Sequence, residues 1–149
     1  RTTDIRDKRR RLLREKPAKG IWDLKMRRGG LLDLEFITQH AILTADPHQP
    51  LSPSLTEAHQ HLLKTGVWTD AFHQEMSEAF AFLQALPQVQ RMANDDITSA
   101  NELSNDLKNR LCRATGCQDY AALSSRLERV CETVETAFCK KIGKAATES

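Results

Sequence analysis

The chain has 149 residues and a formal net charge of +2, with 40% hydrophobic and 28% charged residues, ordinary proportions for a globular domain with a real core. No apolar run approaches the roughly 18–20 residues that span a bilayer, and nothing resembles a signal peptide. A single Tyr, five Pro and the absence of alternating β-branched runs argue against a sheet and predict an all-α fold.

Residues 1–20 are predicted to be dominated by a basic helix that runs from Asp4 to Glu15. Three apolar side chains lie on one side of it: Ile5, Leu12 and Leu13. Three cations repeat every four residues and form a ridge: Arg6, Arg10 and Arg14. Residues 1–30 hold 12 Lys/Arg and 4 Asp/Glu, whereas the remainder holds 10 and 16. This basic end could face nucleic acid, a nucleotide or an acidic partner domain, or simply be solvated.

Residues 21–45 form the segment around which the rest is arranged. Ile21 to Lys25 alternates like a short β-strand, and a basic turn with Gly29 and Gly30 follows. Glycine permits backbone angles that are closed to other residues and lets another group approach the main chain. Good helix formers then run to about Ala45 and are apolar on nearly every side, which places this helix at the centre of a bundle.

Two carboxylates interrupt the apolar surface of the central helix. Asp33 and Glu35 are two residues apart, so they point in nearly opposite directions. They cannot share one metal ion or one proton, and we expect them to serve two separate purposes.

The remaining bundle, residues 54–142, is predicted to hold four more helices with short connections, about six in all, which favours antiparallel neighbours. Ser54 with Glu57, and Ser99 with Glu102, have capping-box spacing. The other signals are Asp119 as the start of the last helix, Pro87 as a break or kink near Leu86, and Phe72, Met76, Ala79, Phe80 and Leu83 as core positions. The tail, residues 143–149, is expected to fray. Together, residues 1–149 are predicted to be a single helical domain.

The four cysteines lack the C-x-x-C spacing of a structural zinc site. We therefore expect reduced thiols in a cytoplasmic protein. His59 and His61 lie on different helix faces, so no metal site is expected. Because the chain begins at Arg1 without a Met, it is interpreted as a piece of a longer protein.

One ordered set of residues resembles a known family: Asp23-Leu24-Lys25, then Gly29-Gly30, then Asp33-Leu34-Glu35-Phe36-Ile37, and Gln39. This pattern is similar to the D-L-K…G-G…D-I-E-F…Q signature of glutamine synthetase adenylyltransferases. There the signature lies in the helical domain that follows each nucleotidyltransferase domain. Ile5-Arg6-Asp7-Lys8-Arg9 also resembles the family's preceding helix. The resemblance is strong from about Asp4 to Leu43 and then fades to a shared helical pattern.

The resemblance implies part of a bifunctional enzyme that attaches AMP to glutamine synthetase and, in its other half, removes it. Ile37-Thr38-Gln39-His40 looks more like the C-terminal, adenylylating half. The related uridylyltransferases share this type of helical domain, although the D-I-E-F form points away from them. ATP and magnesium are implied for the full enzyme, with glutamine synthetase and a PII-type regulator as possible partners.

The chain departs from the superfamily because it contains neither a Gly-Ser nor an Asp-x-Asp motif. Two-metal phosphoryl transfer needs closely placed carboxylates that hold the ions. The sequence therefore predicts a companion of the catalytic domain that has no catalytic residues, binds no cofactor alone and is inactive alone.

Two groups of site residues are proposed on this basis. The candidates for contact with nucleotide or substrate are Lys25, Arg27, Arg28, Gly29, Gly30 and Asp33, because basic side chains and open Gly amides at a helix N-terminus can form an anion site. The alternative is a charged turn that only starts the helix. The expected structural network is Glu35 with Gln39, held by Arg6, Arg10 or Arg14, because a buried carboxylate needs a partner.

Two other function classes remain open at this point. One is a non-catalytic interaction module that docks glutamine synthetase or a PII-type regulator. The other is nucleic-acid binding through the basic first helix. The second is the weaker hypothesis, because the helix lacks the interleaved aromatic residues of single-strand binders and no recognition helix stands out.

Overall fold

The computed structural model describes residues 2–18, 22–48, 54–93 and 103–143, except for the side chains of residues 2–4, 6, 13 and 90–93. The described residues form six helices: α1 (Thr2–Glu15), α2 (Leu31–Ala45), α3 (Leu55–Lys64), α4 (Asp70–Ala93), α5 (Asn105–Thr115) and α6 (Tyr120–Lys141). No strand occurs among them, so the predicted all-α class is confirmed. No described helix is long and apolar enough to cross a membrane.

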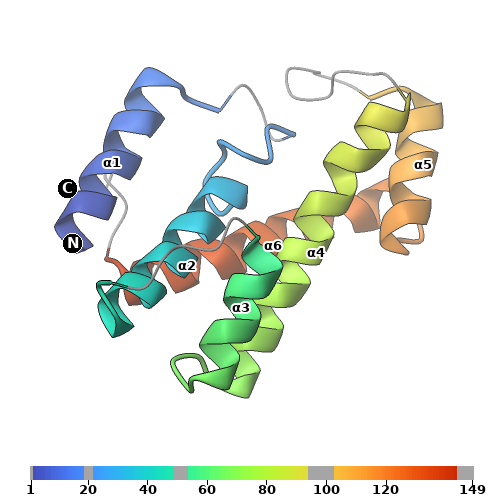
Figure 1. Cartoon of the computed structure of the whole chain (residues 1–149). Coiled ribbons are helices and arrows are strands. Elements are labelled where there is room, and N and C mark those ends of the chain that lie inside the picture. Colours follow the sequence, from blue (N-terminus) through green and yellow to red (C-terminus); the bar gives the residue numbers. More distant parts are fainter. Residues whose placement is uncertain (1, 19–21, 49–53, 94–102, 144–149) are drawn as a thin grey trace.

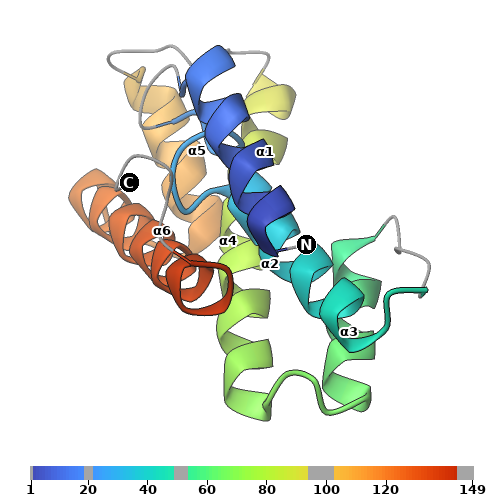
Figure 2. The same cartoon turned by 90° about the vertical axis from the view of Figure 1, so that its left-hand side faces the viewer.

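Helix α2 lies at the centre, as its apolar surface predicts. It packs against α1, α3, α4 and α6. In Figure 1, α3 and the first half of α4 form a hairpin, and α5 folds back along the other end of α4. Helix α6 does not continue this antiparallel pattern, because it crosses α4 obliquely in both views (Figures 1 and 2).

The buried side chains of these helices join into one hydrophobic core. Its most deeply buried members come from α2, α3, α4, α5 and α6: Leu34, Ile37, Leu62, Met76, Leu83, Leu86, Leu111, Leu123, Leu127, Val134 and Phe138. Leu34 and Ile37 point from α2 into this cluster. The core therefore fixes where α2 and α6 lie, and these two helices carry the polar site described below.

Helix termini follow local capping chemistry. The Ser54 side chain accepts a hydrogen bond from the Glu57 backbone N–H, and Asp119 caps α6 in the same way, both as predicted. Helix α5 begins later than expected, because Ser104 caps it and accepts from the Leu107 N–H. The predicted cap at Ser99 and Glu102 lies outside the described residues.

Three expectations need correction. The described part of the segment before the central helix, from Trp22 onward, forms turns rather than a β-like stretch. Of the break or kink expected near Leu86, the break does not occur, because α4 continues through Pro87 to Ala93. Phe80 is only half-buried, and Phe82 is the phenylalanine of α4 that is buried in the core.

Candidate functional site

The basic turn before α2 is built from backbone hydrogen bonds within residues 23–30. The Arg27 N–H donates to the Asp23 carbonyl, and the Gly30 N–H donates to the Arg27 carbonyl. The Asp23 side chain adds an acceptor for the Met26 N–H at 3.4 Å. Trp22 and Leu24 are buried beneath the turn, so this segment is part of the folded core and not a loose loop.

Both glycines are required by close backbone approaches. Gly29 has a φ of 72°, in the left-handed region that favours glycine. A Cβ on Gly29 would overlap the backbone carbonyl of Cys131 in α6, and a Cβ on Gly30 would overlap the Leu24 carbonyl. The turn therefore rests directly on the main chain of α6.

The amides at the start of α2 are already occupied, which contradicts the predicted anion site of open Gly amides. The Gly29 N–H donates to Oδ2 of Asp33 at 2.7 Å. The N–H groups of the next two helix residues donate to carbonyls of the turn: Leu31 to Leu24 at 2.8 Å and Leu32 to Lys25 at 3.1 Å. The turn thus satisfies donors that a helix N-terminus otherwise leaves unpaired.

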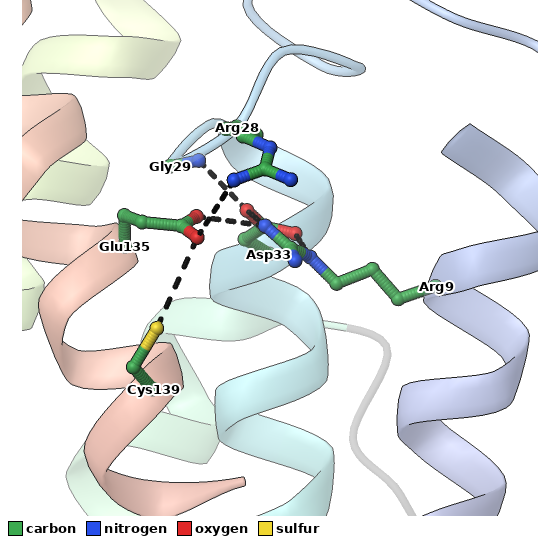
Figure 3. A network of polar contacts seen from close by, with 6 residues as sticks. All are labelled: Arg9, Arg28, Gly29, Asp33, Glu135 and Cys139. Carbon is green, nitrogen blue, oxygen red and sulfur yellow. Dashed lines mark hydrogen bonds and ion pairs between the residues drawn. The ribbon is translucent and has the colours of Figure 1, made fainter. Parts of the chain in front are cut away.

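An ion network under the turn joins three helices (Figure 3). Arg9 of α1 donates from Nε to Oδ1 of Asp33 at 2.6 Å and from Nη2 to Oδ2 at 2.7 Å. Arg9 Nη2 also donates to Oε2 of Glu135 in α6 at 2.7 Å. The guanidinium lies over the Phe138 ring at 4.1 Å. Arg9 and Asp33 are both almost fully buried, so the charges depend on each other.

The electrostatics of the network follow from two carboxylates around one buried guanidinium. Burial lowers the pKa of Arg9, but its hydrogen bonds and attraction to Asp33 and Glu135 outweigh burial, so the net shift is upward and Arg9 stays charged. Burial raises the pKa of Glu135, the nearby Asp33 adds to the rise, and Arg9 and Arg28 oppose it only in part. The net shift of the pKa of Glu135 is therefore upward.

The buried ion pair expected at Glu35 of α2 is formed instead by Asp33. Asp33 is a predicted candidate for contact with nucleotide, yet it is buried. Its Oδ1 accepts from Arg9, and its Oδ2 accepts from both Arg9 and the Gly29 N–H. Glu35 was predicted to form the buried ion pair, yet it is half-buried, and the described side chains contribute no ion pair to it. Arg10 and Arg14 are exposed, and the Arg6 side chain lies outside the described residues. Gln39 is half-buried, with no side-chain hydrogen bond among the described residues.

Sequence reasoning missed Arg9 and Glu135 as members of the network. Arg9 lies four residues after Ile5 and three before Leu12, so it occupies the apolar side of α1, and a cation there was the available signal. Glu135 follows the buried Val134 and lies four residues after the buried Cys131. That position at the edge of the apolar side gave only a weak signal.

Three cations of the turn remain candidates for contact with a ligand. Lys25 is exposed. Arg27 donates to Glu128 at 3.2 Å. Arg28 lies 3.8 Å from Oε1 of Glu135, and 38% of its side chain is exposed. Among the described residues, no group of three or more His, Cys, Asp and Glu side chains is placed to hold a metal ion.

Comparisons with known proteins extend the resemblance to nearly the whole chain. The family model described as GlnD PII-uridylyltransferase matches residues 3–141. The chain is 31% identical over 143 residues to the bifunctional glutamine synthetase adenylyltransferase/adenylyl-removing enzyme of Brucella suis biovar 1 (strain 1330), which covers 96% of this chain and 14% of that protein. It is 32% identical over 142 residues to the enzyme of the same name from Agrobacterium fabrum (strain C58 / ATCC 33970), with 92% and 14% covered.

The similarity therefore does not fade after α2, as the sequence signature suggested, but continues through α6. The chain spans about 14% of the length of the curated relatives that it matches. The matching model bears the name of a uridylyltransferase and these relatives that of an adenylyltransferase, in line with a helical region common to both. The chain thus belongs to the GlnD PII-uridylyltransferase family and aligns with one short segment of the glutamine synthetase adenylyltransferase/adenylyl-removing enzymes.

Proposed function

We propose that this chain is the helical companion domain of a nucleotidyltransferase that adenylylates glutamine synthetase, in the C-terminal half of the enzyme. Its basic turn lines the cleft for ATP and the protein substrate beside a separate catalytic domain. That domain supplies the carboxylates that bind magnesium. The support comes from the names of the relatives and from the absence of Gly-Ser and Asp-x-Asp motifs in this chain.

The observation that carries this proposal is the rigid presentation of cations at the outer edge of the turn. Gly29 touches the α6 main chain, and the buried Arg9–Asp33 pair holds its amide through Asp33. Lys25 and Arg28 stand on this fixed base with exposed side chains. Pre-positioned cations lose little freedom when they bind phosphate groups, which favours a role in substrate orientation.

A full-length enzyme that carries this chain tests the proposal through Lys25→Ala. Because Lys25 is exposed, the variant should keep its melting temperature. It should raise the apparent KM for ATP by about tenfold, the scale of one lost charged contact with phosphate. Lys64→Ala, which removes an exposed lysine in the last turn of α3, is the matched control and should leave KM unchanged.

Two other results would count against this role. A rise in the KM for glutamine synthetase alone, with ATP unaffected, would indicate the interaction module that docks the synthetase. An unchanged KM for both substrates in Lys25→Ala and in Arg28→Ala would remove the turn from the cleft.

A further inference from the structure

Helix α6 meets the basic turn through three positions on one face. Glu128 pairs with Arg27, the Cys131 carbonyl lies against Gly29, and Glu135 lies beside Arg28. These α6 residues are three and four positions apart, so they fall on successive turns of the same face. Successive turns of α6 therefore contact successive residues of the basic turn, and Arg27 and Arg28 each lie beside a different carboxylate of α6.

Glu135 differs from Glu128 because it faces two cations. One oxygen, Oε2, accepts from Arg9 Nη2 at 2.7 Å, and the other, Oε1, lies 3.8 Å from Arg28 Nη1 (Figure 3). The Cys139 Sγ lies 4.0 Å from Oε1. Arg9 already has a bidentate partner in Asp33, so Glu135 is not its only counter-charge. Its contact with Arg28 has no such substitute among the interactions described.

We infer that Glu135 is a positioning residue that directs the Arg28 guanidinium toward a phosphate group of the nucleotide substrate. The inference rests on the proposed function and adds a residue from outside the signature segment. A carboxylate behind an arginine restricts its rotamers while its outer N–H groups stay available to the ligand. The exposed fraction of Arg28, 38%, leaves that outer side accessible.

The fold should tolerate removal of the Glu135 charge. The Arg9–Asp33 pair keeps its two hydrogen bonds, and the ring of Phe138 still covers the guanidinium. Glutamine can still accept a hydrogen bond from Arg9 while it loses the attraction for Arg28.

A double-mutant cycle in the full-length enzyme tests the inference. Arg28→Ala should raise the apparent KM for ATP by about tenfold, and Glu135→Gln by about three- to tenfold, with kcat and the melting temperature little changed. The double variant should be no worse than Arg28→Ala, because Glu135 acts only through Arg28. Glu132→Gln, an exposed carboxylate of the same helix, is the control that should leave KM unchanged.

The outcomes separate the inference from the proposed function. If Arg28→Ala raises KM but Glu135→Gln does not, or if the two effects multiply, Glu135 does not position Arg28 and the inference is overturned. If Arg28→Ala leaves KM unchanged, the nucleotide role of Arg28 itself fails. If Glu135→Gln lowers the melting temperature, Glu135→Asp replaces it in the same cycle. Effects of Glu135→Asp and Arg28→Ala on the KM for ATP that multiply in the double variant would then overturn the inference.

Discussion

Arg9 is 1% exposed and holds its charge inside the protein through Asp33 and Glu135. One guanidinium nitrogen, Nη1, finds no hydrogen-bond partner among the described residues. Burying a guanidinium is costly when the two N–H groups of Nη1 have no partner, so the loss of its bidentate partner Asp33 should destabilise the fold.

Asp33→Asn should lower the free energy of unfolding by about 3–5 kcal/mol, because it leaves the buried Arg9 without its bidentate carboxylate. The partly exposed Glu135 cannot replace that pairing. Urea unfolding followed by circular dichroism measures the change. Glu35→Gln is the matched control on the same helix and should stay within about 0.5 kcal/mol. A stable Asp33→Asn beside an unfolded Glu35→Gln would restore the original assignment of the two carboxylates.

Gly29→Ala should destabilise the protein by more than about 3 kcal/mol, since it adds left-handed backbone strain and a clash with the Cys131 carbonyl. Gly66→Ala is the control, because Gly66 has a φ of 76° and open space around its Cβ position. It should cost only the strain, about 1–2 kcal/mol. Equal losses in thermal unfolding would mean that the turn does not rest on α6.

The sequence predicted that a carboxylate of the central helix pairs with an arginine of the first helix, but it did not identify the right residues. Helix α2 is apolar on nearly every side, so periodicity alone could not say which of its carboxylates faces α1. The partner of Asp33 depends on the rotation of α1 over α2, which tertiary packing decides. Glu135 comes from α6, more than 100 residues away from Asp33, and only the fold brings it there.

Helices α2 and α3 share a buried polar contact. His59 of α3 is 2% exposed, its Nε2 lies 3.1 Å from the Thr38 hydroxyl of α2, and its ring packs against Trp68 and Phe80. Burial, with a smaller contribution from His73, lowers the pKa of His59 to about 4. The folded protein therefore holds this imidazole neutral while the unfolded chain can protonate it.

This difference predicts a pH dependence of stability. Between about pH 6.5 and pH 4 the unfolded chain binds more protons at His59 than the folded protein, so stability falls as the pH falls. The loss should reach about 3 kcal/mol near pH 4. In this pH window, the unfolding free energy of His59→Gln, measured with urea, should change less steeply with pH than that of the wild type. His61→Gln, which replaces an exposed histidine of the same helix, should keep the wild-type dependence of unfolding free energy on pH. If all three proteins show the same dependence, His59 is not its source.

Helix α4 offers a comparison between two nearby phenylalanines. Phe82 is 4% exposed in the core and lies under the Arg126 guanidinium at 4.7 Å, whereas Phe80 is half-buried and meets His59 edge-on. Phe82→Ala should cost about 3–5 kcal/mol of unfolding free energy. Phe80→Ala should cost about 1–2 kcal/mol, because the half-buried Phe80 ring removes less apolar surface from water on folding than Phe82 does. Unfolding of both variants in guanidinium chloride, followed by circular dichroism, compares the two losses of unfolding free energy. A larger loss for Phe80→Ala than for Phe82→Ala would contradict the prediction.

At the scale of elements, local signals predicted most of the helix ends. Ser54 and Asp119 act as caps because their side-chain oxygens accept the free amides of the first turn. The break predicted as one of two outcomes at Pro87 does not occur. Pro87 lacks an N–H for the usual helical bond to the Leu83 carbonyl, yet α4 passes through it, and Leu83 and Leu86 in the preceding turn are fully buried. Tertiary packing outweighs the local cost there, and a single sequence does not show that packing.

For the whole molecule, the all-α class of the described residues was predictable because hydrophobic periodicity is a local property. The oblique crossing of α6 over α4 was not, because it depends on how side chains on both helices interlock. The basic turn was likewise only partly predictable. Its basic residues were recognised in the sequence, but the hydrogen bonds from the Leu31 and Leu32 N–H groups to the Leu24 and Lys25 carbonyls depend on how the chain folds back before α2.

The last prediction concerns activity. Phosphoryl transfer with two metal ions requires carboxylates that hold the ions beside the reacting phosphate. This chain has no Gly-Ser or Asp-x-Asp motif, and its described residues offer no cluster of three metal-ligating side chains. Incubated with labelled ATP, magnesium and glutamine synthetase, the chain alone should therefore leave the synthetase unlabelled. A full-length relative under the same conditions is the positive control, and Lys25→Ala of this chain should also give no label. Transfer of label by the wild-type chain that disappears in Lys25→Ala would mean that the turn belongs to a complete catalytic site, contrary to its proposed role beside a separate catalytic domain.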